Sequence, residues 1–109
     1  MIEPSPDLQL PTKRFGPAPS RIQIVSEAAV IFTNWGYAPV VEAVDLHNDL
    51  HFLVMIGARS IAAALEPLRN GNGGSFVGLR IEIQKESEDR SSKYIIHGLD
   101  SQQAAEKIE

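Results

Sequence analysis

The clearest pattern of hydrophobic and polar positions lies in the second half of the chain. The segment from Leu50 to Ile56 is apolar except for His51 and has the length of a strand. Its alternate residues are apolar on both sides, with Phe52 and Val54 on one face and Leu53 on the other. A strand with two apolar faces is either central in a sheet or covered on both sides.

A short helix is predicted directly after this strand. Ile61, Leu65 and Leu68 recur at the spacing of one helix face. Ser60 precedes them and is a suitable N-cap, because its hydroxyl accepts a hydrogen bond from a free helix N–H group. Pro67 clashes with a longer helix, so we expect about two turns.

Two further strands are predicted after the helix. Between Phe76 and Lys85, apolar residues alternate with Arg80, Glu82 and Gln84. The segment Lys93–Gly98 has the length of a last strand. The glycine-rich segment 70–74 and the polar segment 86–92 are expected to be the connecting loops.

The segment before residue 50 predicts a hairpin. Residues 40–44 follow Pro39, read as the opening of an edge strand, and the Asn- and Asp-rich segment 45–49 is typical of a turn. Residues 21–37 fit two interpretations. β-Branched Val30 and Ile31 favour a strand, whereas residues 25–35 also show helical spacing. We adopt the strand, because the following segments are its natural sheet partners, and the helix stays the alternative.

The composition predicts a single domain with two appendages. A chain of 109 residues has room for one modest core. Residues 1–20 hold five of the seven prolines and are expected to form a flexible, extended arm, with Phe15 as the residue able to dock. Residues 21–99 form the β-rich domain, and residues 100–109 form a mildly acidic tail.

Charge and cysteine content narrow the classes of function. The net charge of −4 argues against a protein that coats duplex DNA by charge alone, although a local basic groove is compatible with it. The absence of cysteine excludes disulfides, thiolate metal sites and thiol nucleophiles. The start of the chain lacks the features of a signal peptide, and no apolar run is long enough to span a bilayer. We therefore expect a cytoplasmic protein without a membrane partner.

The order of the predicted elements resembles that of the OB-fold. In this small five-stranded barrel a helix lies between the third and fourth strands. Here the helix would be Ile61–Leu68, the fourth strand Phe76–Lys85 and the fifth Lys93–Gly98. The resemblance covers residues 21–99 and depends on element order, without a sequence motif. The fold class it implies is mostly β with one short helix. An α+β sheet with one or two helices packed on one face fits the same pattern.

Candidate binding residues follow from the same resemblance. OB-type domains bind single strands by stacking bases on exposed aromatic side chains beside basic ones. Trp35 and Tyr37, two apart on a strand, would share a face. The alternative is a Trp35 that fills the core. The basic candidates are Arg59, Arg80, Lys85 and Lys93. For Arg80 the competing interpretation is a solvated sheet face on which Arg80 or Lys93 pairs with Glu82.

Metal binding and catalysis have little support in the pattern. His47 lies in the predicted turn and His51 in a strand, a spacing unsuited to a zinc pair, and His97 is remote in sequence. The glycine-rich segment 70–74 lacks the Lys-Ser/Thr ending of a phosphate-binding loop. No nucleophile has an adjacent histidine partner. We expect no cofactor, no metal and no enzymatic activity.

Two functions remain as hypotheses. The first is a non-enzymatic module that binds single-stranded nucleic acid on an OB-like barrel. The second is a small protein-interaction domain, such as an adaptor, an assembly subunit or an inhibitor of a larger complex, favoured by the acidic balance and the two apolar faces of the strand at residues 50–56. A homodimer is compatible with both.

Overall fold

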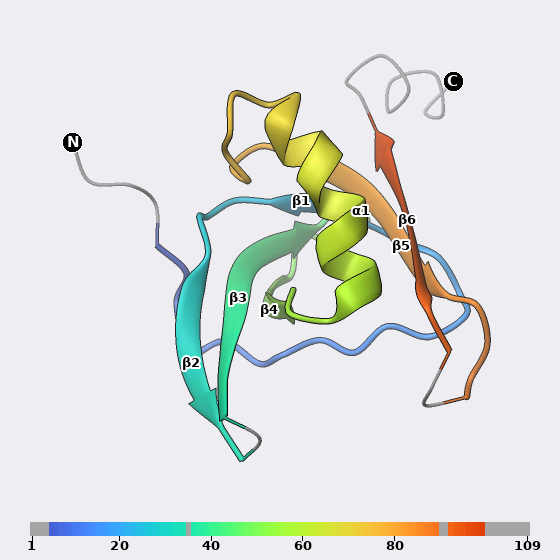
Figure 1. The fold of residues 1–109 in the computed structure, drawn as a ribbon, viewed down its shortest axis with the longest axis horizontal. Helices are drawn as coiled ribbons and strands as arrows, with labels where there is room; N and C mark the ends of the chain where they lie inside the picture. The colour runs from blue at the N-terminus through green and yellow to red at the C-terminus, as the bar shows by residue number, and fades with distance from the viewer. Residues whose placement is uncertain (1–4, 35, 90–91, 100–109) are drawn as a thin grey trace.

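The computed structural model describes residues 5–34, 36–89 and 92–99, which form one β-rich unit with a single helix over the sheet (Figure 1). The strands are β1 (Ser20–Ile24), β2 (Ala29–Thr33), β3 (Gly36–Asp45), β4 (His51–Met55), β5 (Arg80–Lys85) and β6 (Tyr94–Leu99), and the helix is α1 (Arg59–Asn70). The strand interpretation of residues 29–33 is therefore confirmed over the helical one.

The six strands form one antiparallel sheet in the order β2-β3-β1-β5-β6, with β4 paired to β3. The long strand β3 organises this sheet. Its residues 36–40 pair with β2, its residues 43–45 with β1, and its residues 40–44 with β4. The residues of β3 that pair with β4 overlap those that pair with β1 and with β2. Strands β1 and β2 must therefore both lie on the edge of β3 opposite β4. Strand β3 begins at Gly36, so Pro39 lies inside it and does not open it.

A bulge separates β1 from β2 along their common partner. Ile24 pairs with Ala43 and Ala29 with Val40, so the first strand advances five residues while β3 advances three. The Oγ of Ser26 fills the gap in the ladder, because it accepts a hydrogen bond from the N–H of Glu42 at 2.9 Å. Ser26 is 1% exposed. The bulge bends the chain, which lets β1 continue to β5 while β2 stays on β3.

The predicted hairpin between β3 and β4 is confirmed. The carboxylate of Asp45 accepts hydrogen bonds from the N–H groups of His47 and Asn48, and Asn48 Oδ1 accepts one from Leu50. Asp49 has a φ of 61°, the left-handed conformation that aspartate tolerates in turns.

Helix α1 is longer than predicted and begins differently. It spans twelve residues and contains Pro67, which shortened the predicted helix to two turns. Its N-cap is Ala58, without a side-chain cap. Ser60, the predicted cap, instead accepts a hydrogen bond from the N–H of Tyr94 at 3.3 Å. The predicted apolar face is confirmed, since Ile61 and Leu65 are buried and Leu68 packs against the core.

Strand β5 begins at Arg80, later than the predicted Phe76. Residues 76–79 form an irregular segment in which Gly78 has a φ of 92°. Its backbone still bonds to β1, because the N–H of Gly78 donates to the carbonyl of Ile24. The carboxylate of Glu27 receives hydrogen bonds from the N–H of Phe76 and the hydroxyl of Ser75. The bulge is thereby tied to the connection that follows the helix.

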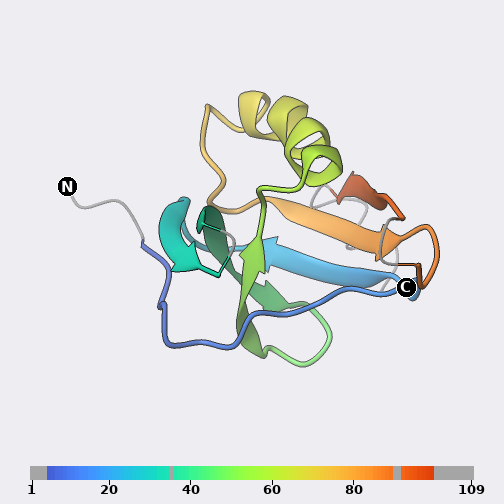
Figure 2. The same ribbon diagram turned by 60° about the horizontal axis from the view of Figure 1, so that its bottom comes forward.

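The core lies between the inner face of the sheet and α1, which covers the sheet from one side (Figure 2). The strands contribute mainly alternate β-branched residues, and the helix contributes one apolar face. The most deeply buried large side chains are Ile22, Ile24, Val40, Val41, Ile81 and Ile83.

The sheet does not close into the expected barrel. In the described part of the chain, no ladder joins β4 to β6. Helix α1 lies alongside β6 instead. Ser60 bonds to Tyr94 at one end, and a Cβ on Gly98 would lie 2.7 Å from Leu68 Cδ2 at the other. The mostly β class with one helix is thus confirmed, as an open six-stranded sheet.

The proline-rich segment runs extended along the edge of β4. The N–H of Lys13 donates to the carbonyl of Leu53 at 2.9 Å, and the N–H of Leu53 donates to the carbonyl of Pro11 at 2.8 Å. Phe15 is 7% exposed and packs edge-on against Phe52, with ring centroids 6.3 Å apart. Phe15 therefore docks, and the flexibility of the arm stays a prediction.

The bulge predicts a large effect of Ser26→Ala. Without the buried hydroxyl, the partly buried N–H of Glu42 loses its partner, so the free energy of unfolding should fall by about 1–3 kcal/mol. Urea denaturation measures the change, with the exposed Ser87→Ala as the matched control at about 0.5 kcal/mol or less. Equal stability of the two variants would contradict the role given to Ser26.

Candidate functional site

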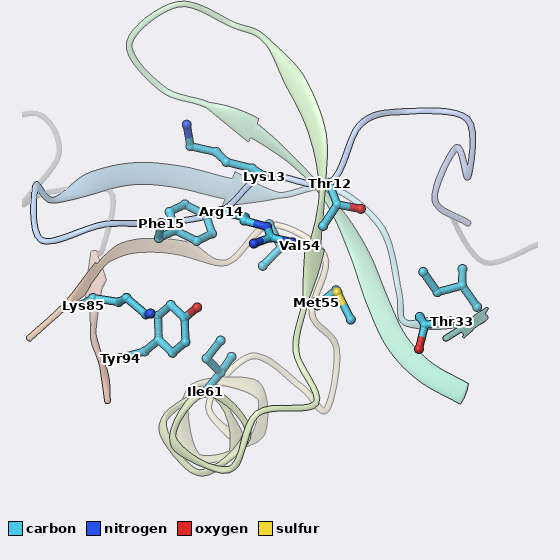
Figure 3. Close-up of a pocket in the computed structure, with 11 residues that line it drawn as sticks. Thr12, Lys13, Arg14, Phe15, Thr33, Val54, Met55, Ile61, Lys85 and Tyr94 are labelled. Carbon is cyan, nitrogen blue, oxygen red and sulfur yellow. The ribbon is translucent and has the colours of Figure 1, made fainter. Parts of the chain in front are cut away.

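A large groove lies on the side of the molecule where β4 and β6 fail to pair. It has a volume of about 630 Å³ and lies between the arm, β4, the first turn of α1 and the adjoining ends of β5 and β6 (Figure 3). Most of its wall is apolar, from Ile31, Val54, Met55 and Ile61. The remaining lining residues are Thr12, Lys13, Arg14, Phe15, Thr33, Lys85 and Tyr94.

Within the part of the chain that the structure describes, three cations line this groove and no acidic residue does. Lys13 and Arg14 come from the arm, which two backbone hydrogen bonds to Leu53 hold against β4. Lys85 lies two residues after buried Ile83, on the same face of β5, and therefore reaches the rim of the core. In a chain with fourteen acidic and ten basic residues, this lining is a local reversal of charge.

Aromatic rings hold two of these ammonium groups. The Nζ of Lys85 lies 5.5 Å from the ring centroid of Tyr94, and the Nζ of Lys13 lies 5.4 Å from that of Phe52. Figure 3 shows Arg14 in the middle of the view, whereas the ammonium of Lys13 extends away from Lys85 and Tyr94. The groove therefore combines cations at separate points with one partly buried tyrosine.

A smaller cavity of about 360 Å³ continues the groove toward the β2–β3 hairpin. The two cavities share Met55, Ile61 and Tyr94. Tyr37, which is 78% exposed, lines the smaller cavity but not the larger one. Its ring contacts that of Phe32 edge-on, with centroids 5.1 Å apart. The combined surface thus has a tyrosine at two separate positions.

The binding residues predicted from the sequence do not converge on one site. Tyr37 and Lys85 line the connected cavities, but Arg80 lies on the outer face of β5, where its Nε donates to Gln23 Oε1 at 3.1 Å. Arg59 and Lys93 are exposed and line neither cavity. Trp35 lies outside the described residues. The binding roles of all six residues stay predictions.

The competing interpretation expected a polar sheet face on which Arg80 or Lys93 pairs with Glu82. The polar face and the cross-strand pairing are present, but the partner of Glu82 is a different residue. Glu82 does form a cross-strand ion pair, but with Arg21, whose Nε lies 3.2 Å from Glu82 Oε1. The register explains the difference, since Arg21 on β1 is directly opposite Glu82, and the residue opposite it on β6 is His97. This face is therefore occupied by neighbouring polar pairs.

The cations that sequence analysis missed are Lys13 and Arg14. They belong to the segment interpreted as a flexible arm, so they were not counted with the folded domain. The available signal was the Lys-Arg-Phe sequence at residues 13–15, since a docked Phe15 necessarily places its two basic neighbours against the body.

The histidines form no metal site in residues 5–34, 36–89 and 92–99, where no three potential ligands are grouped. His51 Nδ1 lies 2.7 Å from Glu42 Oε2, and His47 lies in the β3–β4 turn. In the same ranges, no helix is long and apolar enough to cross a membrane.

Comparison with known proteins adds no relative: no protein-family model, no curated protein and no solved structure matches this chain. The function must therefore be argued from the groove itself.

Phe15 is predicted to hold the basic part of the groove in place. Phe15→Ala removes a buried aromatic side chain, so the arm should detach more often and expose the bonds after Lys13 and Arg14. Limited trypsin digestion should cut there at least about tenfold faster than in the wild type. Leu8→Ala, at an arm position that is 52% exposed, is the control. Equal cleavage of both variants would show that Phe15 does not anchor the arm.

Proposed function

We propose that this chain is a non-enzymatic module that binds single-stranded nucleic acid in the groove. The observation that carries the proposal is the lining of Lys13, Arg14 and Lys85, with no carboxylate among the described lining residues, on an otherwise acidic chain. Such a site attracts a polyanion locally while the rest of the surface repels it, which directs the strand into the groove.

The chemistry of the walls supports a single strand rather than a duplex. A sequence-tolerant single-strand site combines basic side chains that follow the phosphates with aromatic rings that stack on the bases. Here the cations supply the first and Tyr94 and Tyr37 the second. A duplex hides its bases in the stack and leaves such rings without a partner.

An OB-like architecture is part of the same proposal. In the expected barrel, the first strand pairs with the second and also with the fourth. If β3 is counted as the second barrel strand, β4 as the third and β5 as the fourth, the pairing of β1 with both β3 and β5 agrees with this arrangement. The position of α1 between β4 and β5 in the sequence agrees with it too. The barrel would be opened between β4 and β6, and the groove lies at that opening.

Arg14→Gln is predicted to weaken binding to a fluorescent oligo-dT. Loss of one phosphate contact should raise the dissociation constant about fivefold at low salt and reduce the salt slope by about 0.7. Arg80→Gln is the matched control, because it removes the same charge from the opposite face. Fluorescence anisotropy measures both. Equal weakening by the two variants would indicate that net charge, and not the groove, governs binding.

Tyr37→Ala is predicted to remove a stacking contact without disturbing the core, because the side chain is mostly exposed. The loss should be about 1–3 kcal/mol, which corresponds to a rise in the dissociation constant of about 5- to 150-fold. Tyr37→Phe keeps the ring and should retain the affinity. A Tyr37→Phe variant as weak as Tyr37→Ala would rule out stacking at this position.

A protein-interaction domain is the second candidate function. It is favoured by the exposed apolar side chains of the β2–β3 hairpin, where Val30, Phe32 and Tyr37 are 62%, 75% and 78% exposed. Absence of any salt-sensitive oligonucleotide binding at low ionic strength would reject the first proposal and leave this one.

A further inference from the structure

Strand β2 is an edge strand without a charge on it. It is the first strand in the sheet order, so among the described strands only β3 pairs with it (Figure 1). Its five residues are Ala-Val-Ile-Phe-Thr, a sequence with high strand propensity. Edge strands usually carry charges, prolines or a covering segment that prevent pairing with another chain. Val30 and Phe32 are 62% and 75% exposed, so the described part of the arm leaves their face of the strand uncovered.

The backbone of β2 presents pairing groups at its outer side. Pro39 lies opposite Val30, has no N–H, and its carbonyl accepts a hydrogen bond from Ile56 on the other side of β3. The Val30–Pro39 pair is therefore not hydrogen-bonded. Hydrogen-bonded and non-hydrogen-bonded pairs alternate along an antiparallel ladder. The N–H and C=O groups of Val30 therefore point away from β3, and so do those of Phe32, two residues further on.

We propose that β2 pairs with β2 of a second copy of this chain, antiparallel and about a two-fold axis at Ile31. In this register Val30 lies opposite Phe32 of the other copy, and both residues turn their free backbone groups toward the partner. The two equivalent pairs can exchange four hydrogen bonds. The strand is thus complementary to itself, and no charge opposes a like charge.

The exposed side chains would form one apolar row across the axis. Phe32 already contacts Tyr37 on β3, so the row would run from Tyr37 through Phe32 to Val30 of the partner. The exposed parts of these three side chains amount to roughly 400 Å² per copy. The total is below the area of a standard stable interface, so we expect a weak dimer that forms at micromolar to higher concentrations.

A dimer formed through β2 would also affect the groove, because the other face of β2 lines the large cavity. Ile31 and Thr33 point to that face and line the large cavity. Pairing about Ile31 would bring the two cavities together at the axis as one continuous track. This part rests on the proposed function, and it deepens it: the preferred ligand would be a single strand long enough to reach both copies.

Sedimentation velocity of the full chain without nucleic acid tests the pairing. The wild type should shift from monomer to dimer between low micromolar and near-millimolar concentration. Val30→Pro removes one outward N–H from an edge strand, where proline is tolerated, and should stay monomeric. Val30→Lys should do the same, whereas Leu50→Lys, at a position 63% exposed in the distant β3–β4 turn, should dimerise like the wild type. Thermal unfolding checks that all variants are folded.

The outcomes separate the two proposals. A wild type that stays monomeric throughout, or dimers that Val30→Pro does not affect, would overturn the β2 pairing, and in the first case the exposed hairpin would be left for a different partner. If pairing holds, oligo-dT long enough for two grooves should bind two chains and bind tighter than a half-length strand, and Val30→Pro should lose that gain. A dimer that binds no oligo-dT would overturn the proposed function while confirming the pairing.

Discussion

The arrangement of the whole sheet depends on one interruption in its backbone ladder. Between β1 and β2 the chain carries two residues more than its partner β3, and the hydroxyl of Ser26 satisfies the N–H of Glu42 that the bulge would otherwise leave unpaired. Because of this bend, β1 turns toward β5 and β2 remains on β3. The same bend therefore creates the central pairing and the uncovered edge.

The second constraint is that the arm and α1 occupy the edges along which β4 and β6 would have to pair. Closure would require these two edges to meet, but the arm pairs with Leu53 on one edge and α1 lies along the other, with Leu68 close to Gly98. The groove is what remains between them. Its chemistry follows from the same packing, since burial of Phe15 places Lys13 and Arg14 on the wall of the groove.

The large cavity and the apolar row proposed for the dimer lie on opposite faces of one hairpin. Ile31 and Thr33 face the groove, whereas Phe32 contacts Tyr37 on the exposed side. Strand alternation makes this division unavoidable. An interface on β2 would thus join the two large cavities through the geometry of a single strand, and Tyr37, which lines the smaller cavity and contacts Phe32, would belong to both surfaces.

The sequence alone determined the elements whose patterns are local: the turn at Asp45, the apolar face of Ile61 and Leu65, and the alternation at Ile81 and Ile83. Such features depend on neighbours a few residues away, and the structure confirms them. Tertiary structure decided the open sheet, the docking of the arm and the lining of the groove. These depend on contacts between residues far apart in the chain, which no local periodicity records.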